Sequence, residues 1–234
     1  MAIALVQQKP AVGNIPSEQL GGTTLEITFD SNVTAGNLIT LCFGEVQSNF
    51  TVADTQNCTW YQDKSLQNPE LSEMYLSSYH CYAKNSASMK ITITSSYAAI
   101  IGCAQEWSGV TSGLTAGASG SNSSHHGVNS DTLDTGYDGA SGNCLHLAAG
   151  FFGGIVPPSI LDGNFTLLNK DDSFYDTTSA GSWNLSVAYR IASGSQHCVW
   201  TFDETTPTIG TIVAFAQTTP NPTGPFPTFR PDLT

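Results

Sequence analysis

Apolar and polar residues alternate along most of this chain, which is the pattern of β strands. The clearest example is WNLSVAYRI at 183–191, where every second residue from Trp183 to Ile191 is apolar. Side chains of a strand point alternately to its two faces, so this period predicts one face on a core and one face on water. Almost no segment shows the 3.6-residue period of an amphipathic helix.

About eleven segments carry a strand pattern. They are 3–8, 23–29, 37–44, 57–62, 73–83, 89–95, 97–107, 143–152, 183–191, 196–202 and 210–217. Residues 38–43 and 98–104 are more uniformly apolar than the other segments, which predicts central strands covered on both faces. Clusters of Gly, Asn, Asp and Ser separate the segments, as turns require. This pattern predicts an all-β antiparallel sandwich of two sheets, jelly-roll-like in topology.

Two stretches break the strand pattern. Residues 111–142 are rich in Gly, Ser, Asn, Thr and Asp, which predicts a loop-rich part of the sandwich with weak strands at 114–118 and 127–130. From residue 218 on, closely spaced prolines exclude helix and sheet interior and favour an extended chain. The predicted organisation is a domain over 1–217 and a proline-rich arm over 218–234, with a disordered tail as the alternative for the arm.

The charge balance excludes some classes of partner. Charged residues make up 11% of the chain, and the formal net charge is -12 with 7 Lys and Arg. Nucleic-acid binding needs basic clusters that displace counterions, so we expect no nucleic-acid partner. We expect no membrane partner either, because an anionic surface repels the chain and no run approaches the ~20 apolar residues of a span. The N-terminus lacks the basic start of a signal peptide, which predicts no export; a removed leader is the alternative.

The spacing of the cysteines does not indicate a metal site. The chain has 6 of them, widely spaced and without a C-x-x-C pair, which argues against structural zinc. Cys42 and Cys103 lie in apolar runs, which is typical of small hydrophobic side chains. Cys58 and Cys81 are candidates to face each other on paired strands, either bridged or free.

Several segments together resemble a widespread β-sandwich domain of phage virion proteins and bacterial extracellular proteins. In chain order they are TLEITFDSNVTAGNLITLCFGE (24–45), YHCYAKNSASMKITIT (79–94), AAIIGCAQEWSGV (98–110), CLHLAAGFFGG (144–154) and WNLSVAYRIAS (183–193). The similarity covers most of 3–217, and its motifs concern packing and turns, so the resemblance implies a fold and no catalytic residues.

In organisation the chain is similar to phage capsid decoration (cement) proteins. The resemblance implies a non-enzymatic structural protein of a tailed-phage virion, assembled in the host cytoplasm, with an extracellular location as the alternative. Its expected partners are further copies of itself, as a trimer, and the major capsid protein or another virion subunit. The expected contact residues are the N-terminal segment to residue 16 and the arm, with Pro220, Pro222, Phe226, Phe229 and Arg230.

The sequence contains candidate residues for two other functions. A glycan-binding module of a phage fibre or secreted protein would stack sugars on exposed tryptophans, for which Trp60 and Trp200 are the candidates. A glycoside hydrolase would need paired carboxylates, for which Glu45 and Glu106, each ending an apolar strand, are the candidates. The E-x-D-x-E strand signature of sandwich glucanases is absent.

Metal ligands are sparse, and we expect no metal and no cofactor. Asp131, Asp134 and Asp138 are weak calcium candidates that do not match EF-hand spacing. Asp171, Asp172 and Asp176 form a second acidic cluster that could bind calcium. Two further groups are weak candidates for metal ligands. They are Cys144, His146, His197 and Cys198, and the pair His125 and His126.

Overall fold

The computed structural model of this chain describes residues 2–12, 23–45, 50–68, 74–95, 100–110, 123–153, 159–160, 164–168, 173–176 and 181–217. All regular elements in these ranges are strands, so the prediction of an all-β protein is confirmed. The strands are β1 (Ala4–Val12), β2 (Thr23–Thr28), β3 (Leu38–Glu45), β4 (Phe50–Asp54), β5 (Tyr61–Gln67), β6 (Tyr75–Tyr82), β7 (Lys90–Ser95), β8 (Ile100–Ser108), β9 (Ser123–Asp134), β10 (Asn143–Gly153), β11 (Ser159–Ile160), β12 (Thr166–Leu167), β13 (Ser173–Asp176), β14 (Gly181–Ser193) and β15 (Val199–Ala216).

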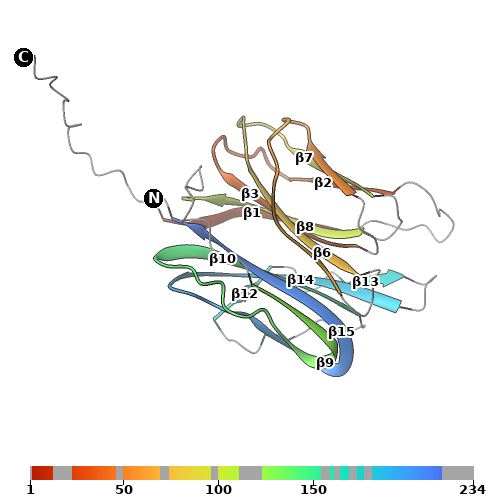
Figure 1. The fold of residues 1–234 in the computed structure, drawn as a ribbon. Helices are drawn as coiled ribbons and strands as arrows, with labels where there is room; N and C mark the ends of the chain where they lie inside the picture. Colours follow the sequence, from red (N-terminus) through yellow and green to blue (C-terminus); the bar gives the residue numbers. More distant parts are fainter. Residues whose placement is uncertain are drawn as a thin grey trace, which may run out of the picture.

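The described strands form three antiparallel sheets, where the sequence predicted two. The five-stranded sheet has the order β1-β8-β3-β6-β5, and the three-stranded sheet has the order β2-β7-β4. The seven-stranded sheet has the order β11-β15-β10-β14-β12, with β13 paired to β14 and β9 paired to β15. Figure 1 shows the sheets as layers, with β2 and β7 at the top, β3 and β8 in the middle, and β10 and β15 below.

The five- and seven-stranded sheets meet across a shared hydrophobic cluster. Its buried residues come from both sheets and include Leu38, Trp107, Leu147, Phe151 and Val187. Phe151 of β10 lies directly against Gly44 of β3, where a Cβ atom would overlap the phenyl ring. The absence of a side chain at residue 44 therefore lets the two sheets approach closely at this point.

Polar side chains inside this interface satisfy one another. The Trp107 indole N–H donates to Thr40 Oγ1 at 2.9 Å, and Thr40 Oγ1 donates to Gln105 Oε1 at 2.7 Å. Gln105 Nε2 in turn points at Cys103 Sγ, at 2.8 Å. Buried polar groups are costly unless they are hydrogen-bonded, so this chain of contacts allows Thr and Gln in a central sheet.

The middle sheet has a second core on its other face. Ile39, Leu41 and Phe43 of β3 pack there against the three-stranded sheet. The Phe43 and Phe50 rings meet edge to face with centroids 4.8 Å apart. All residues of β3 are buried, which confirms the prediction that 38–43 form a central strand covered on both faces.

The seven-stranded sheet carries a third cluster on its outer face. Leu133 at the end of β9 and Trp200 at the start of β15 fold over this face, together with Phe165. Leu133 lies where Cβ atoms of Gly150 and Gly210 would stand, at 3.1 Å and 2.9 Å from its Cδ2 atom. These glycines make the room for a large side chain above the sheet.

The expectation that one face of 183–191 meets water is wrong for residues 184–188 of β14, whereas Arg190 is partly exposed. Asn184, Ser186 and Ala188 are 3%, 3% and 0% exposed. Ala188 belongs to the outer cluster, because Phe165 and Trp200 cover that face of the sheet. The alternation along β14 therefore reflects two buried faces, one more apolar than the other, and not one buried face and one solvent face.

The strand boundaries differ from the prediction where polar residues take part in the sheet. Segments 196–202 and 210–217 belong to one strand, β15, whose pairing with β9 shifts register between Thr201 and Thr208. Strand β9 occupies a stretch predicted to be mostly loop, because its sequence SSHHGVNSDTLD has few apolar residues. Strand β4 was missed altogether, and residue 57, predicted to start a strand, has a positive φ of 54°.

We predict that Gly44→Ala lowers the free energy of unfolding by about 1–3 kcal/mol, because the added methyl group pushes on the Phe151 ring and the sheets cannot both keep their positions. Chemical denaturation measures this loss. Phe151→Leu in the same chain should restore part of it, since the smaller side chain leaves room.

The control for this prediction is Gly102→Ala on the opposite face of the five-stranded sheet. Its Cβ would lie 3.0 Å from Leu25 Cδ2, the flexible end of a side chain, so the loss should be smaller. Equal losses at both glycines, with no effect of Phe151→Leu, would remove the special role of the Gly44 contact.

Candidate functional site

Glu106 is a buried carboxylate that joins three segments of the fold. It accepts hydrogen bonds from Gln7 Nε2 at 2.6 Å, from the Thr34 backbone N–H at 2.8 Å and from Asn37 Nδ2 at 2.7 Å. The side chain is fully buried. Three donors compensate the loss of water around the carboxylate, so Glu106 anchors β1 and the loop before β3 to the central strand β8.

Glu45 lies far from Glu106. Antiparallel β3 and β8 pair Glu45 with Ile100 and Ile39 with Glu106, so the two glutamates stand at opposite ends of the pairing. The six residues between positions 39 and 45 correspond to roughly 20 Å along the strand. Carboxylates of glycoside hydrolases stand about 5–10 Å apart, so the structure does not assemble the catalytic pair considered from the sequence.

Glu45 is instead a buried acid at the margin of the core between the five- and three-stranded sheets. Its side chain is 1% exposed, and neither carboxyl oxygen makes a well-formed hydrogen bond. Burial raises its pKa to about 8, and the nearby Ser95 hydroxyl lowers it slightly. Burial also raises the pKa of neighbouring Tyr79 to about 12, with the charge of Glu45 adding to this effect. Glu45 thus folds as a neutral acid at neutral pH.

We predict that Glu45→Gln flattens the alkaline part of the stability curve. Folded Glu45 keeps its proton to higher pH than unfolded Glu45. Its contribution to the free energy of unfolding is therefore fully present below about pH 4.5, where both states hold the proton, and it is lost as pH rises through about 8. Gln cannot ionise, and the variant should be more stable than the parent by about 1–3 kcal/mol near pH 9. Urea denaturation between pH 5 and 9 measures the difference.

The control is Glu26→Gln, which changes a glutamate that is paired with Lys90 at 2.6 Å on the surface. Exposed pairs contribute little, so this variant should follow the parent curve. Burial also raises the pKa of Asp63. Because Asp63 is present in all three proteins, its effect on the pH dependence cancels in the comparison. Parallel curves for the parent and Glu45→Gln would refute the prediction.

A third buried acid, Asp138, holds a histidine in the outer part of the seven-stranded sheet. Asp138 Oδ2 contacts His146 Nδ1, and both side chains are fully buried. Asp138 Oδ1 also accepts from the backbone N–H groups of Ala140 and Gln196, at 3.0 Å and 3.1 Å, and from Ser195 Oγ at 3.2 Å. Burial disfavours ionisation of Asp138, but the contact with His146 and the hydrogen bonds from the Ala140 and Gln196 backbone N–H groups outweigh it and hold its pKa below the ordinary value.

The surroundings of His146 leave no ring nitrogen for chemistry. Its Nδ1 atom faces Asp138, and its Nε2 atom lies 3.2 Å from the Ala192 carbonyl oxygen. Each ring nitrogen therefore already has an oxygen atom of the protein as its partner. The Ser195 hydroxyl contacts Asp138 and the Gly139 backbone N–H, not the imidazole, so Ser195, His146 and Asp138 do not form a nucleophile–base relay.

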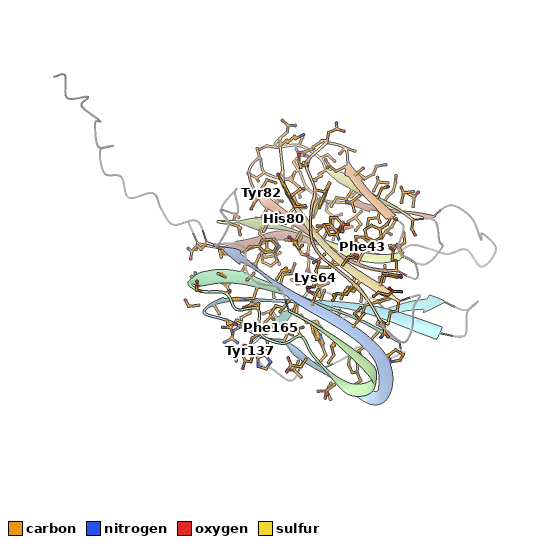
Figure 2. The ribbon with its side chains drawn as sticks, viewed as in Figure 1. Phe43, Lys64, His80, Tyr82, Tyr137 and Phe165 are labelled. Atoms are coloured by element: carbon orange, nitrogen blue, oxygen red, sulfur yellow. The ribbon has the colours of Figure 1, made fainter. Side chains whose placement is uncertain are left out.

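A second acid–histidine pair lies near the margin between the two larger sheets. His80 Nδ1 is 2.6 Å from Asp63 Oδ1, and the two side chains are 3% and 11% exposed. The His80 ring stacks on Tyr61 and meets the Phe215 ring of β15 edge to face, with centroids 5.2 Å and 5.4 Å apart. Figure 2 shows His80 beside Tyr82 at this level of the molecule. The pair therefore links β5 and β6 to the opposite sheet.

One exposed aromatic group stands out beside these buried pairs. Tyr137 is 65% exposed and stacks on His197 with ring centroids 4.3 Å apart. His197 Nδ1 lies 3.0 Å from Asp134 Oδ1, which also accepts the Gly136 backbone N–H at 2.9 Å. We call Tyr137, His197 and Asp134 the Tyr137 surface; Figure 2 shows Tyr137 on the side of the seven-stranded sheet away from His80.

The sequence reasoning missed the Tyr137 surface. Tyr137 lies between two glycines with positive φ, Gly136 and Gly139, on a loop that Asp134 and Asp138 fix from both sides. A Tyr between glycines and aspartates was the available signal. That signal is incomplete, because residue 197 is distant in the sequence and meets Tyr137 only in the fold.

The tryptophans predicted to stack sugars are not equivalent in the structure. Trp200 is 0% exposed and lies in the outer hydrophobic cluster, so the proposal of a sugar platform at Trp200 is wrong. A stacking platform needs an exposed ring face. Trp60 is partly buried against the core between the five- and three-stranded sheets, and its indole N–H donates to Asp54 Oδ2 at 2.9 Å.

The aspartates considered as calcium ligands contact different residues and do not converge on one point. Asp134 contacts His197 and Gly136, whereas Asp138 contacts His146. Within the described ranges, no group of three or more His, Cys, Asp or Glu residues is placed to hold a metal ion. The remaining candidates lie outside the described residues or have side chains that are not described, namely Asp131, His125, His126, Asp171, Asp172 and Asp176.

The predicted contact residues of the arm, Pro220, Pro222, Phe226, Phe229 and Arg230, lie outside the described residues, as does the N-terminal segment 13–16. Their role stays a prediction. In the part of the chain that is described, no helix is long and apolar enough to span a membrane.

Comparison with known proteins finds no relative. No protein family, no curated protein and no solved structure matches this chain.

Proposed function

We propose that this chain is a structural protein of a tailed-phage virion, a capsid decoration protein that stabilises the shell by surface contacts and acts without catalysis. The proposal includes a β-sandwich of jelly-roll type as the body and an extended arm over 218–234. It rests on the resemblance of the strand segments and on the proline-rich C-terminus.

The observation that carries the proposal is the use of the buried acids. Glu106 accepts three hydrogen bonds, and Asp138 is held by His146, Ser195 and two backbone N–H groups. Each of these carboxylates ties together segments that are far apart in the sequence. Groups with the chemistry of catalysts therefore cross-link strands, which is what a rigid coat component needs.

The expected mode of binding is contact over a broad surface. A stable interface buries about 1,200–2,000 Å² in total, and an arm that lies on a neighbouring subunit extends such a footprint. Phe226 and Phe229 supply apolar groups to an arm that prolines keep extended. In the expected trimer, the three linked subunits bind the shell together, and this multivalency raises the overall affinity.

We predict that deleting residues 218–234 weakens binding to the shell at least about tenfold while the fold stays intact, since tenfold corresponds to about 1.4 kcal/mol, which one lost aromatic contact supplies. Cosedimentation with shells of the phage that encodes this chain, prepared without it, measures the binding. Light scattering of the free chain measures self-association, expected to be trimeric.

The matched control is the double variant Phe226→Ala and Phe229→Ala, which keeps the length of the arm. It should lose most of the binding that the deletion loses, and both proteins should unfold at the parent temperature. If the deletion binds like the parent, the arm is not the contact. If the parent itself does not sediment with the shells, the decoration function is wrong.

A second candidate function is glycan binding at the Tyr137 surface. An exposed aromatic ring with one face on His197 presents its remaining surface to a ligand, and Asp134 next to it offers a carboxylate for sugar hydroxyls. The loop is held by hydrogen bonds at Asp134 and Asp138, so binding there would cost little ordering of the protein.

We predict that, if this candidate is correct, Tyr137→Ala abolishes binding on a glycan array, because the stacking surface is removed. Tyr61→Ala is the matched control, since Tyr61 is also an exposed tyrosine stacked on a histidine. An array without signal from the parent protein, or equal signals from the two variants, excludes the Tyr137 surface as a glycan site.

A further inference from the structure

Two cysteine thiols stand in contact at the margin of the core between the five- and three-stranded sheets. Cys58 lies just before β5, and Cys81 lies in β6. Their thiols interact by a side-chain hydrogen bond. Both are free thiols; Cys81 is fully buried, whereas Cys58 is partly exposed. A pair of this kind has one sulfur that solvent reaches and one that only its partner reaches.

The backbone around Cys58 is fixed to the end of β6. The Cys58 N–H donates to Asp54 Oδ2 at 3.0 Å. Gln56 Oε1 accepts the backbone N–H groups of Lys84 and Asn85, at 3.1 Å and 3.0 Å, and Lys84 Nζ contacts the Asn57 carbonyl. These contacts hold the turn at 54–58 against residues 81–85, so Cys58 and Cys81 stay side by side in the folded protein.

We propose that Cys58 and Cys81 form a reversible disulfide when the protein meets a low-molecular-weight disulfide such as oxidised glutathione. This modification site lies outside the arm and the Tyr137 surface, and it does not depend on shell binding or on glycan binding at Tyr137. The bond would connect the chain that enters β5, the edge strand of the five-stranded sheet, with the neighbouring strand β6.

The reaction has two balanced steps. The Cys58 thiolate attacks one sulfur of oxidised glutathione; a Cys58–glutathione mixed disulfide forms, and one glutathione leaves as a thiolate that takes up a proton. The Cys81 thiolate then attacks the Cys58 sulfur and releases the second glutathione. Two protein thiols are oxidised, and one glutathione disulfide is reduced to two thiols.

The environment sets the order of these steps. Burial raises the pKa of Cys58, and it raises the pKa of Cys81 much further, while the positive charge of Lys84 acts in the opposite direction on Cys81. Cys58 is thus the thiol that reacts first, and closure by Cys81 is the slow step. Both steps should accelerate from neutral to alkaline pH.

The chain contains a second neighbouring pair that serves as an internal comparison. Cys42 of β3 and Cys103 of β8 stand directly opposite in the register. They are 1% and 0% exposed, so no small disulfide reaches either sulfur in the folded protein. Proximity is common to both pairs, and access distinguishes them.

The test treats the native protein with oxidised glutathione at about pH 9 and follows the products by mass spectrometry after acid quenching. The expected course is transient glutathione addition, then an intact protein two hydrogen atoms lighter, with peptides containing Cys58 and Cys81 joined. Reduction should reverse the change. The oxidised protein should unfold several degrees higher than the reduced protein, because the bridge restricts the unfolded chain.

Three variants make the result specific. Cys58→Ser should give no bridge, and Cys81→Ser should stop at the mixed disulfide on Cys58. Cys42→Ser should bridge like the parent, which excludes a link from Cys42. A stable mixed disulfide on Cys58 of the parent protein, a bridge between other cysteines, or no reaction under conditions where Cys58 is alkylated by iodoacetamide would each overturn the proposal.

Discussion

The fold depends on the close approach of the five- and seven-stranded sheets, and that approach depends on the contact of Phe151 with Gly44. A large aromatic ring on one sheet requires a position without a side chain on the other. Toward the other end of β3 the Trp107 ring packs against Tyr189, with centroids 5.0 Å apart, and aliphatic side chains of both sheets fill the remaining space. Since β3 and β8 are covered on both faces, the three-stranded sheet and the seven-stranded sheet are held through the same central strands.

Buried polar groups give this protein its cross-links. Glu106, Asp138 and Asp63 each contact a side chain from a different part of the chain, and the Trp107–Thr40–Gln105 contacts run through the core itself. An unsatisfied buried polar group is costly, so such contacts favour one arrangement of the strands over others. Glu45 differs, because it lacks well-formed hydrogen bonds and is accommodated by keeping its proton.

The same features explain why isolated sequence motifs are poor guides to activity here. Glutamates at strand ends and a histidine two residues after a cysteine are patterns that also occur in catalytic and metal sites. In this fold the residue at the other end of each contact decides the role: Asn37 and Gln7 for Glu106, and Ala192 and Asp138 for His146. Tyr137 differs from these residues, because its ring remains largely exposed.

The sequence by itself determined the fold class and most of the strands, because the two-residue period of side chains depends only on local backbone geometry. It also identified β3 and β8 as central strands from their continuous apolar runs. It did not determine the number of sheets, since packing partners lie far apart in the chain: Leu133 and Trp200 turn the supposed solvent face of β14 into a core, and bury a tryptophan expected to be exposed. The polar strand β9 exists because β15 offers it hydrogen bonds along its length, which no local pattern records. Likewise, only the tertiary structure separated Glu45 from Glu106 and brought Tyr137 to His197, because antiparallel pairing sets distances that spacing along the chain cannot.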